Sequence, residues 1–110
     1  VRIRVLAALD QAERDGAVAV VIEAIKLVEG GLATLCDEVW LVGCDPSVQR
    51  SRLVGRGTSP DDATVRVAAQ ADLVERWRSA ATFVIDSSGP VADVRRAAED
   101  RLERMLSRTA

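Results

Sequence analysis

The stretch from Glu38 to Arg56 constrains the fold most, because it combines features of a strand, a capped turn and a helix. Residues 39–44 form a short apolar run with β-branched and aromatic members, which is typical of a buried strand. Asp45 suits a helix N-cap and Pro46 suits the first helical position, so we predict a helix over 46–54. A strand that leads through a capped turn into an arginine-bearing helix indicates an α/β protein that handles phosphate.

The other predicted elements alternate along the chain in the same way. Residues 17–22 and 82–86 have the composition of buried strands, and the first run is apolar on both faces. Strands separated by helices favour a parallel sheet with right-handed crossovers. With 110 residues, we expect one α/β domain over 1–110, with about three parallel strands and helices on both faces. Helices are predicted over 1–14, 46–54, 62–79 and 90–107. The third is expected to be capped by Asp61 or Asp62, and the fourth by Ser88 or Gly89. Residues 23–35 are predicted to form a connection and residues 55–60 a loop.

Composition and charge argue against several classes of protein. The net charge is −2, so nothing indicates a nucleic acid or an anionic membrane as a partner. No apolar run approaches the ~20 residues needed to span a bilayer. The two cysteines, Cys36 and Cys44, occur without any histidine and do not match the four-ligand pattern of a zinc site, so no metal ligand is assigned. No signal peptide is visible, and we expect a cytoplasmic protein with reduced thiols.

Five segments follow one another as in dephospho-CoA kinases, and the sequence resembles that family across nearly its whole length. The segments are 21–32, 35–42, 45–56, 68–70 and 84–89. The resemblance implies the three-layer, parallel-sheet fold of P-loop kinases and the phosphorylation of the 3′-hydroxyl of dephospho-CoA, with ATP and Mg²⁺, to give CoA. The phosphate loop G-x-x-x-x-G-K-[ST] is absent from these residues. We therefore expect the carboxyl-terminal half of such a kinase, a partial domain that is inactive alone and whose partner is the missing amino-terminal half or a second chain.

Two arginines are implied to be catalytic by this resemblance. Arg56 lies where the family has a lid, here residues 55–80, and an arginine brought over the phosphates stabilises the charge that develops in transfer. The alternative is a solvated arginine at the negative end of a helix dipole. Arg52 has the same two alternatives. Because it lies one helical turn before Arg56, it could instead pair with Asp45 or Glu38.

The turn after the last predicted strand is the candidate nucleotide contact. It resembles the Val-Ile-Asp-Asn-x-Gly turn of the family, with serine in place of the asparagine, and backbone amides at a helix N-terminus could meet an adenine or a phosphate. A structural cap is the other use of such a turn. The residues assigned to nucleotide binding are Asp86, Ser87, Ser88 and Gly89.

Four further residues are assigned to substrate binding by the resemblance. Glu29 lies where the family has an acidic residue near the CoA-side cleft, and its alternative role is to cap Gly30 and Gly31. Gln70 ends the Ala-Ala-Gln segment, and Arg76 and Arg78 flank Trp77, where the family has a basic residue.

Two other functions remain open on the sequence. One is a non-catalytic interaction or regulatory module that retains the kinase fold without the phosphate loop. The other is a P-loop kinase that acts on a different small metabolite, because lid arginines are common in such kinases.

Overall fold

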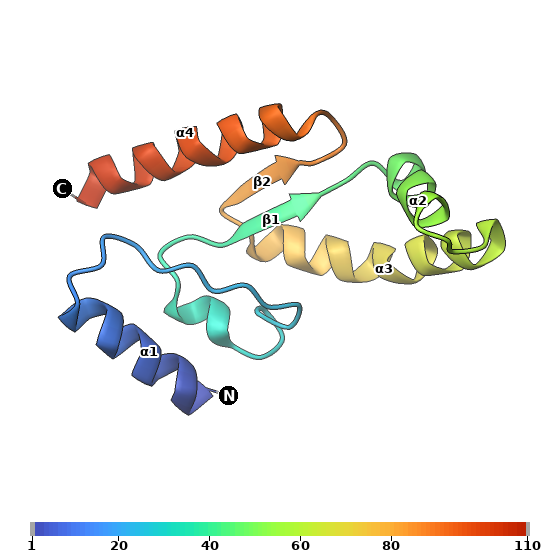
Figure 1. Cartoon of the computed structure of the whole chain (residues 1–110). Coiled ribbons are helices and arrows are strands. Elements are labelled where there is room, and N and C mark those ends of the chain that lie inside the picture. Colours follow the sequence, from blue (N-terminus) through green and yellow to red (C-terminus); the bar gives the residue numbers. More distant parts are fainter. Residues whose placement is uncertain (1, 110) are drawn as a thin grey trace.

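A computed structural model of the chain describes residues 2–109 and contains helices around a small parallel sheet (Figure 1). The chain begins with helix α1 and, after a long connection, a short 3₁₀ helix, η1. Strand, helix, helix, strand and helix then follow. The bounds are α1 Arg2–Arg14, η1 Leu32–Leu35, β1 Trp40–Gly43, α2 Pro46–Gly55, α3 Pro60–Ala80, β2 Phe83–Asp86 and α4 Val91–Thr109.

The sheet confirms the predicted α/β class and the parallel pairing. Strands β1 and β2 are parallel, and Trp40 is the register partner of Phe83 and Val42 that of Ile85. The sheet lies between α4 and α3, and both strands point toward α2 (Figure 1). The carboxyl ends of the strands therefore face the arginine-bearing helix α2.

The strand predicted over residues 17–22 is absent from the structure, so the described residues form two strands and not about three. This segment is extended chain without regular structure, and Val18 and Val21 are 84% and 87% exposed. A strand exists only when a neighbouring strand completes its hydrogen-bond ladder, and within residues 2–109 β1 pairs with β2 alone. The run has the side chains of a central strand but lacks a strand beside it.

The cap of α2 follows the sequence, that of α3 differs, and α4 begins at Val91, one residue later than predicted. Asp45 caps α2 by accepting a hydrogen bond from the amide of Ser47 at 2.9 Å, and Pro46 opens the helix as predicted. Helix α3 begins two residues earlier than predicted, because Ser59 caps it by accepting from the amide of Asp62 at 3.2 Å. The two aspartates that were expected as caps instead lie in the first turn, where the helix dipole favours negative charge.

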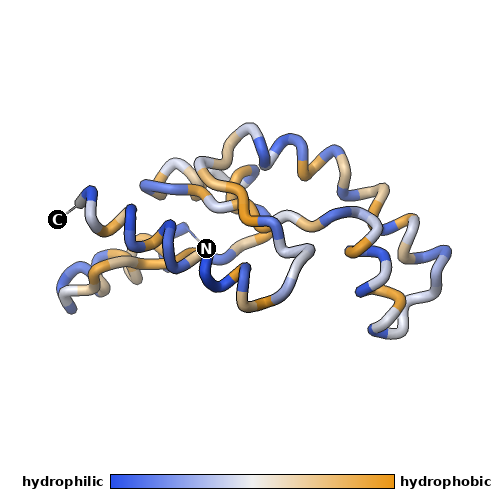
Figure 2. Tube along the Cα trace, turned by 90° about the horizontal axis from the view of Figure 1, so that it is seen from above, coloured by the Kyte–Doolittle hydropathy of each residue, from blue (hydrophilic) through white to orange (hydrophobic). Residues whose placement is uncertain are grey.

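Few side chains of the described residues are buried. Hydrophobic and hydrophilic residues nevertheless alternate along the helices, as expected of helices that cover a core (Figure 2). The buried ones are Leu32, Ala63 and Ile85. On one face of the sheet the rings of Trp40 and Phe83 meet edge to face, with their centroids 5.5 Å apart. Arg101 of α4 lies over the Phe83 ring at 4.8 Å, which extends this small core toward the last helix.

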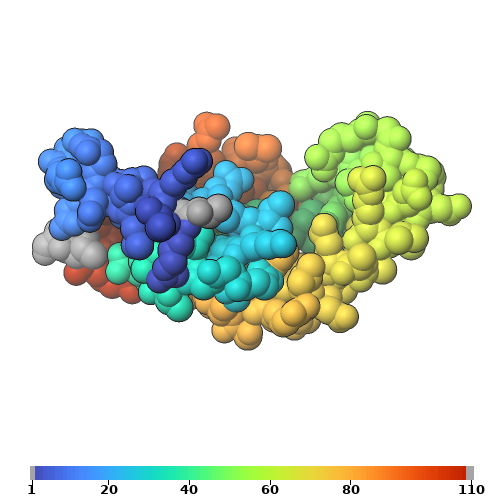
Figure 3. Space-filling view, turned by 90° about the horizontal axis from the view of Figure 1, so that it is seen from below, coloured from blue at the N-terminus to red at the C-terminus, as the bar shows by residue number. Residues whose placement is uncertain are grey.

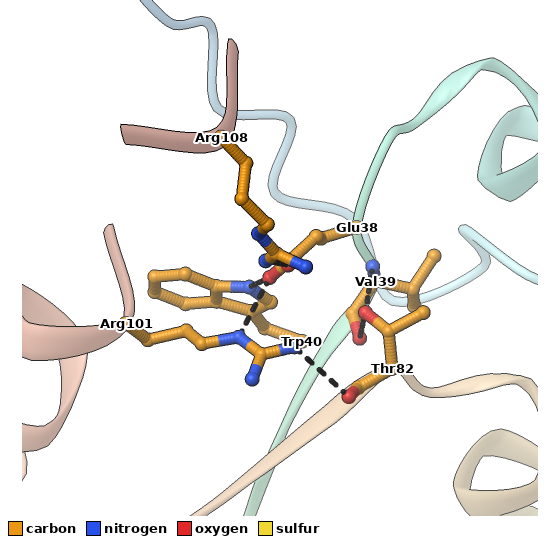
Figure 4. A network of polar contacts seen from close by, with 6 residues as sticks. All are labelled: Glu38, Val39, Trp40, Thr82, Arg101 and Arg108. Atoms are coloured by element: carbon orange, nitrogen blue, oxygen red, sulfur yellow. Dashed lines mark hydrogen bonds and ion pairs between the residues drawn. The ribbon is translucent and has the colours of Figure 1, made fainter. Parts of the chain in front are cut away.

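A carboxylate before β1 holds α4 in place (Figure 4). Glu38, whose side chain is 8% exposed, accepts from Nε of Arg101 at 3.0 Å and from a terminal nitrogen of Arg108 at 2.6 Å. It also accepts from the indole nitrogen of Trp40 at 2.8 Å. The hydrogen bond from Arg101, followed by that from Trp40, lowers the pKa of Glu38 to about 2. We call these four residues the Glu38 cluster; it joins the start of β1 to the second half of α4.

Candidate functional site

The ends of the two strands are joined by a set of hydrogen bonds that we call the strand-end junction, residues 43–45 and 86–88. Both the amide and the hydroxyl of Ser87 donate to the carbonyl oxygen of Gly43, at 2.7 and 2.9 Å. The amide of Asp45 donates to the hydroxyl of Ser88 at 2.8 Å. The predicted nucleotide turn is therefore fastened to the point where β1 ends and α2 begins.

Arg52 of α2 reaches back to this junction. One terminal nitrogen of its guanidinium donates to the carbonyl oxygen of Ser87 at 2.7 Å and lies 3.4 Å from that of Ser88. The other donates to the sulfur of Cys44 at 3.6 Å. The pairing with Asp45 or Glu38 that the sequence left open is replaced by these contacts, because the carboxylate of Asp45 is engaged by Ser47 and that of Glu38 by α4.

The carboxylates of the junction are held in their charged form. The hydroxyl and amide of Ser47 lower the pKa of Asp45, and the hydroxyl and amide of Ser88 lower that of Asp86. The positive charge of Arg52 acts in the same direction on Asp86. Both groups therefore act as hydrogen-bond acceptors in this junction at neutral pH.

Arg56 lies one helical turn beyond Arg52, at the C-terminus of α2. Its Nε is 3.4 Å from the carbonyl oxygen of Arg52, a long contact, and its side chain is exposed. Gly57 follows with φ at +101°, a conformation that turns the chain sharply toward α3. Arg50, whose sequence position suggests a surface charge, is exposed and donates to the hydroxyl of Thr64 at 2.8 Å, which links α2 to α3.

The four predicted substrate residues lie on or beside α3, and the structure brings Glu29 to it. The indole nitrogen of Trp77 donates to the carboxylate of Glu29 at 2.6 Å. The amide of Glu29 itself and then this indole lower the pKa of the carboxyl, and Arg76 contributes. Gln70 accepts from the side-chain amide of Gln49 at 3.1 Å, and Arg78 lies 3.8 Å from Glu75.

Trp77 and Gln49 are the contacts that the sequence reading missed. On the sequence, Trp77 could be a core residue, which we favoured, or line the cleft; in the structure it is half-buried and bonded to Glu29. Seen from below, an open notch separates the N-terminal segment, blue to cyan, from α2 and the start of α3, green to yellow (Figure 3).

The described residues contain neither a cluster suited to a metal ion nor a helix suited to crossing a membrane. In residues 2–109, no three carboxylate, thiol or imidazole side chains come close enough together to hold a metal ion. In the same residues, none of the helices has the length and apolar character that crossing a bilayer requires.

Comparison with known proteins assigns most of the chain to one family. Residues 1–93 match the family model described as dephospho-CoA kinase. The chain belongs to the dephospho-CoA kinase family. No solved structure is significantly similar to it.

Curated relatives bear the family name, and the match covers a minor part of each. The dephospho-CoA kinase of Symbiobacterium thermophilum is 40% identical over 90 residues, which are 81% of this chain and 37% of that protein. That of Cutibacterium acnes is 38% identical over 97 residues, 87% of this chain and 40% of the relative. That of a Synechococcus is 46% identical over 72 residues, 64% of this chain and 34% of the relative. The chain thus spans less than half the length of these dephospho-CoA kinases.

Proposed function

We propose that this chain is the carboxyl-terminal part of a dephospho-CoA kinase, which transfers the terminal phosphate of ATP to the 3′-hydroxyl of dephospho-CoA. Membership of the family supports the reaction, and the strand-end junction supports the assignment of parts. The observation that carries the proposal is that Arg52 of α2 bonds to the very turn, Ser87 and Ser88, that the resemblance assigns to the nucleotide. Ligands of open α/β sheets bind beyond the carboxyl ends of the strands, where this junction lies.

The proposal assigns a role to each candidate residue. In this proposal the turn 86–89 contacts the nucleotide, and residues 55–80 form a lid that carries Arg56 toward the phosphates. A guanidinium placed there offsets negative charge that builds up during transfer. Glu29, Gln70, Arg76 and Arg78, which lie on or beside α3, are the candidate contacts to dephospho-CoA.

ATP and Mg²⁺ need groups that this chain does not supply. The sequence has no G-x-x-x-x-G-K-[ST] loop to cradle the β- and γ-phosphates, and residues 2–109 offer no cluster of side chains suited to Mg²⁺. We therefore assign the cradle for the β- and γ-phosphates and the metal site to the amino-terminal part that the longer relatives contain, and derive no step through Mg²⁺ from this chain.

A chimera tests the proposal. In it, the matching 90 residues of the Symbiobacterium thermophilum kinase are replaced by those of this chain. We expect ATP-dependent conversion of dephospho-CoA to CoA by the chimera and none by the 110-residue chain alone, measured by chromatography of the products. CoA formation by the isolated chain would contradict the division of parts, and a folded but inactive chimera would favour the non-catalytic module.

A further inference from the structure

The two terminal nitrogens of the Arg52 guanidinium bond to the protein itself. One of its terminal nitrogens faces the carbonyl oxygens of Ser87 and Ser88, at 2.7 and 3.4 Å, and the other faces the sulfur of Cys44 at 3.6 Å. An arginine presents its donors in a rigid planar fork, so these contacts fix the orientation of the guanidinium and direct one terminal nitrogen at the turn. Arg56, by contrast, has only a long contact with the carbonyl oxygen of Arg52.

The turn held by Arg52 is fixed from two directions. Its amides and hydroxyls bond to β1 and to its own aspartate: Ser87 bonds to Gly43, and the amide of Ser88 donates to Asp86 at 2.9 Å. Its carbonyls bond to Arg52 on α2. Arg52 is thus the link between the turn and the middle of α2, across 35 residues of sequence.

Helix α2 in turn determines where Arg56 lies. Arg56 follows Arg52 by one turn, and α2 is joined to α3 by the contacts from Arg50 to Thr64 and from Gln49 to Gln70. A change in the orientation of α2 relative to the turn would therefore move Arg56 and the start of α3 together.

We infer that Arg52 is a positioning residue, which holds the Ser87–Ser88 turn at one fixed placement relative to α2 and hence to Arg56. This inference rests on the proposed function. It replaces the catalytic role that the resemblance implied for Arg52, and it leaves Arg56 as the arginine that meets phosphate. Arg52 acts through the turn on nucleotide binding, and Arg56 acts on the transfer step.

Amide hydrogen exchange of the 110-residue chain tests the contact directly. Arg52→Ala should speed the exchange of the Ser87 and Ser88 amides by about tenfold or more, while the amides within β1 and β2 keep their rates. Arg52→Lys should fall between, because an ammonium can reach one carbonyl but does not offer the planar fork. Arg50→Ala, on the same helix, is the matched control and should leave the turn unchanged. Equal exchange at the turn in wild type and Arg52→Ala would overturn the inference.

Kinetics of the chimera separate positioning from catalysis. Arg52→Ala should raise the KM for ATP by about tenfold and change kcat by less than about threefold, with partial recovery in Arg52→Lys. A fall in kcat as large as that of Arg56→Ala, with KM unchanged, would show direct contact with the reacting phosphate and overturn the inference. A chimera that is inactive with Arg52 intact counts against the proposed function, and the exchange experiment then decides the inference alone.

Discussion

The arginines of this chain make different kinds of contact, although their side chains are identical. Arg101 and Arg108 share the carboxylate of Glu38, and Arg52 donates to main-chain carbonyls. Arg56 has neither kind of partner at short range among the described residues. Exposure and bonding therefore separate Arg56 from the three arginines whose guanidinium groups are bonded within the fold, a difference that residue type alone does not show.

Arg56→Ala in the chimera should lower kcat by at least about 10²-fold, with a smaller change in ATP affinity. A positive group that approaches the phosphates helps most where negative charge accumulates in the transition state. Arg56→Lys should recover part of the loss, since an ammonium cannot bond to two phosphate oxygens through a planar fork. Steady-state kinetics with both substrates saturating gives the result, and a thermal melt checks folding. Full kcat in a folded Arg56→Ala variant would refute the lid role; Arg50→Ala serves as the control.

Glu38 should make the stability of the chain depend on pH. Its folded-state pKa is about 2, below the ordinary value of 4.5, so its contribution is complete above about pH 4.5 and is lost as the pH falls through 2. Glu38→Gln should therefore reduce the free energy of unfolding by about 2–3 kcal/mol at pH 7, and the difference from wild type should vanish near pH 2. Urea denaturation at pH 7, 4 and 2 measures this.

Glu75→Gln is the matched control for Glu38→Gln. The carboxylate of Glu75 lies 3.8 Å from Arg78, and both side chains are more than half exposed. Exposed pairs of this kind contribute about 0–1 kcal/mol. If Glu75→Gln were as destabilising as Glu38→Gln, the Glu38 cluster would have no special place in the fold.

Elements were predictable from the sequence where local chemistry decides them. Asp45-Pro46 predicted the start of α2, and the apolar runs before Gly43 and Asp86 predicted two parallel strands. Local chemistry was not enough at 17–22, where the apolar pattern was read correctly but the strand needs a neighbour. The site residues could be placed at the strand ends, yet the bond from Arg52 to Ser87 spans 35 residues and depends on tertiary packing.

Ser59→Ala should destabilise α3 at its first turn. The hydroxyl of Ser59 accepts from the amide of Asp62, and loss of such a cap costs about 1 kcal/mol. Ser59→Asp should restore the cap, because a carboxylate accepts the same bond and suits the helix dipole. Chemical denaturation of both variants measures the change. No loss in Ser59→Ala would indicate that one of the aspartates in the first turn takes over as the cap, as the sequence first suggested.

The whole molecule exposes more surface than its mass requires. A compact monomer of 11.8 kDa exposes about 5,900 Å², whereas this chain exposes 8291 Å². Its radius of gyration is 16.4 Å, against about 13 Å for a compact chain of this length. The excess exposed area is larger than the area of about 800 Å² that each partner buries in a standard protein–protein interface. This agrees with the proposal that further polypeptide completes the domain.

Val42→Thr should distinguish the chain alone from the completed kinase. Val42 is 61% exposed, although its register partner Ile85 is 4% exposed. In the 110-residue chain the substitution should change the free energy of unfolding by less than about 0.5 kcal/mol, and in the chimera, where we expect Val42 to be covered, by more than about 1 kcal/mol. Ile85→Ala should cost about 2–5 kcal/mol in both. A large effect of Val42→Thr in the isolated chain would mean that this edge of the sheet is already covered.

The exposed run at residues 17–22 also bears on how the protein behaves in a concentrated solution. Its sequence, Ala-Val-Ala-Val-Val-Ile, is uncharged, lacks proline and is rich in β-branched residues. Segments of this composition stack into cross-β fibrils when they stay accessible. In newly made chains, burial of this segment therefore competes with aggregation. A charged residue introduced at Val18 or Val21 would act as a gatekeeper that slows fibril growth in the purified chain.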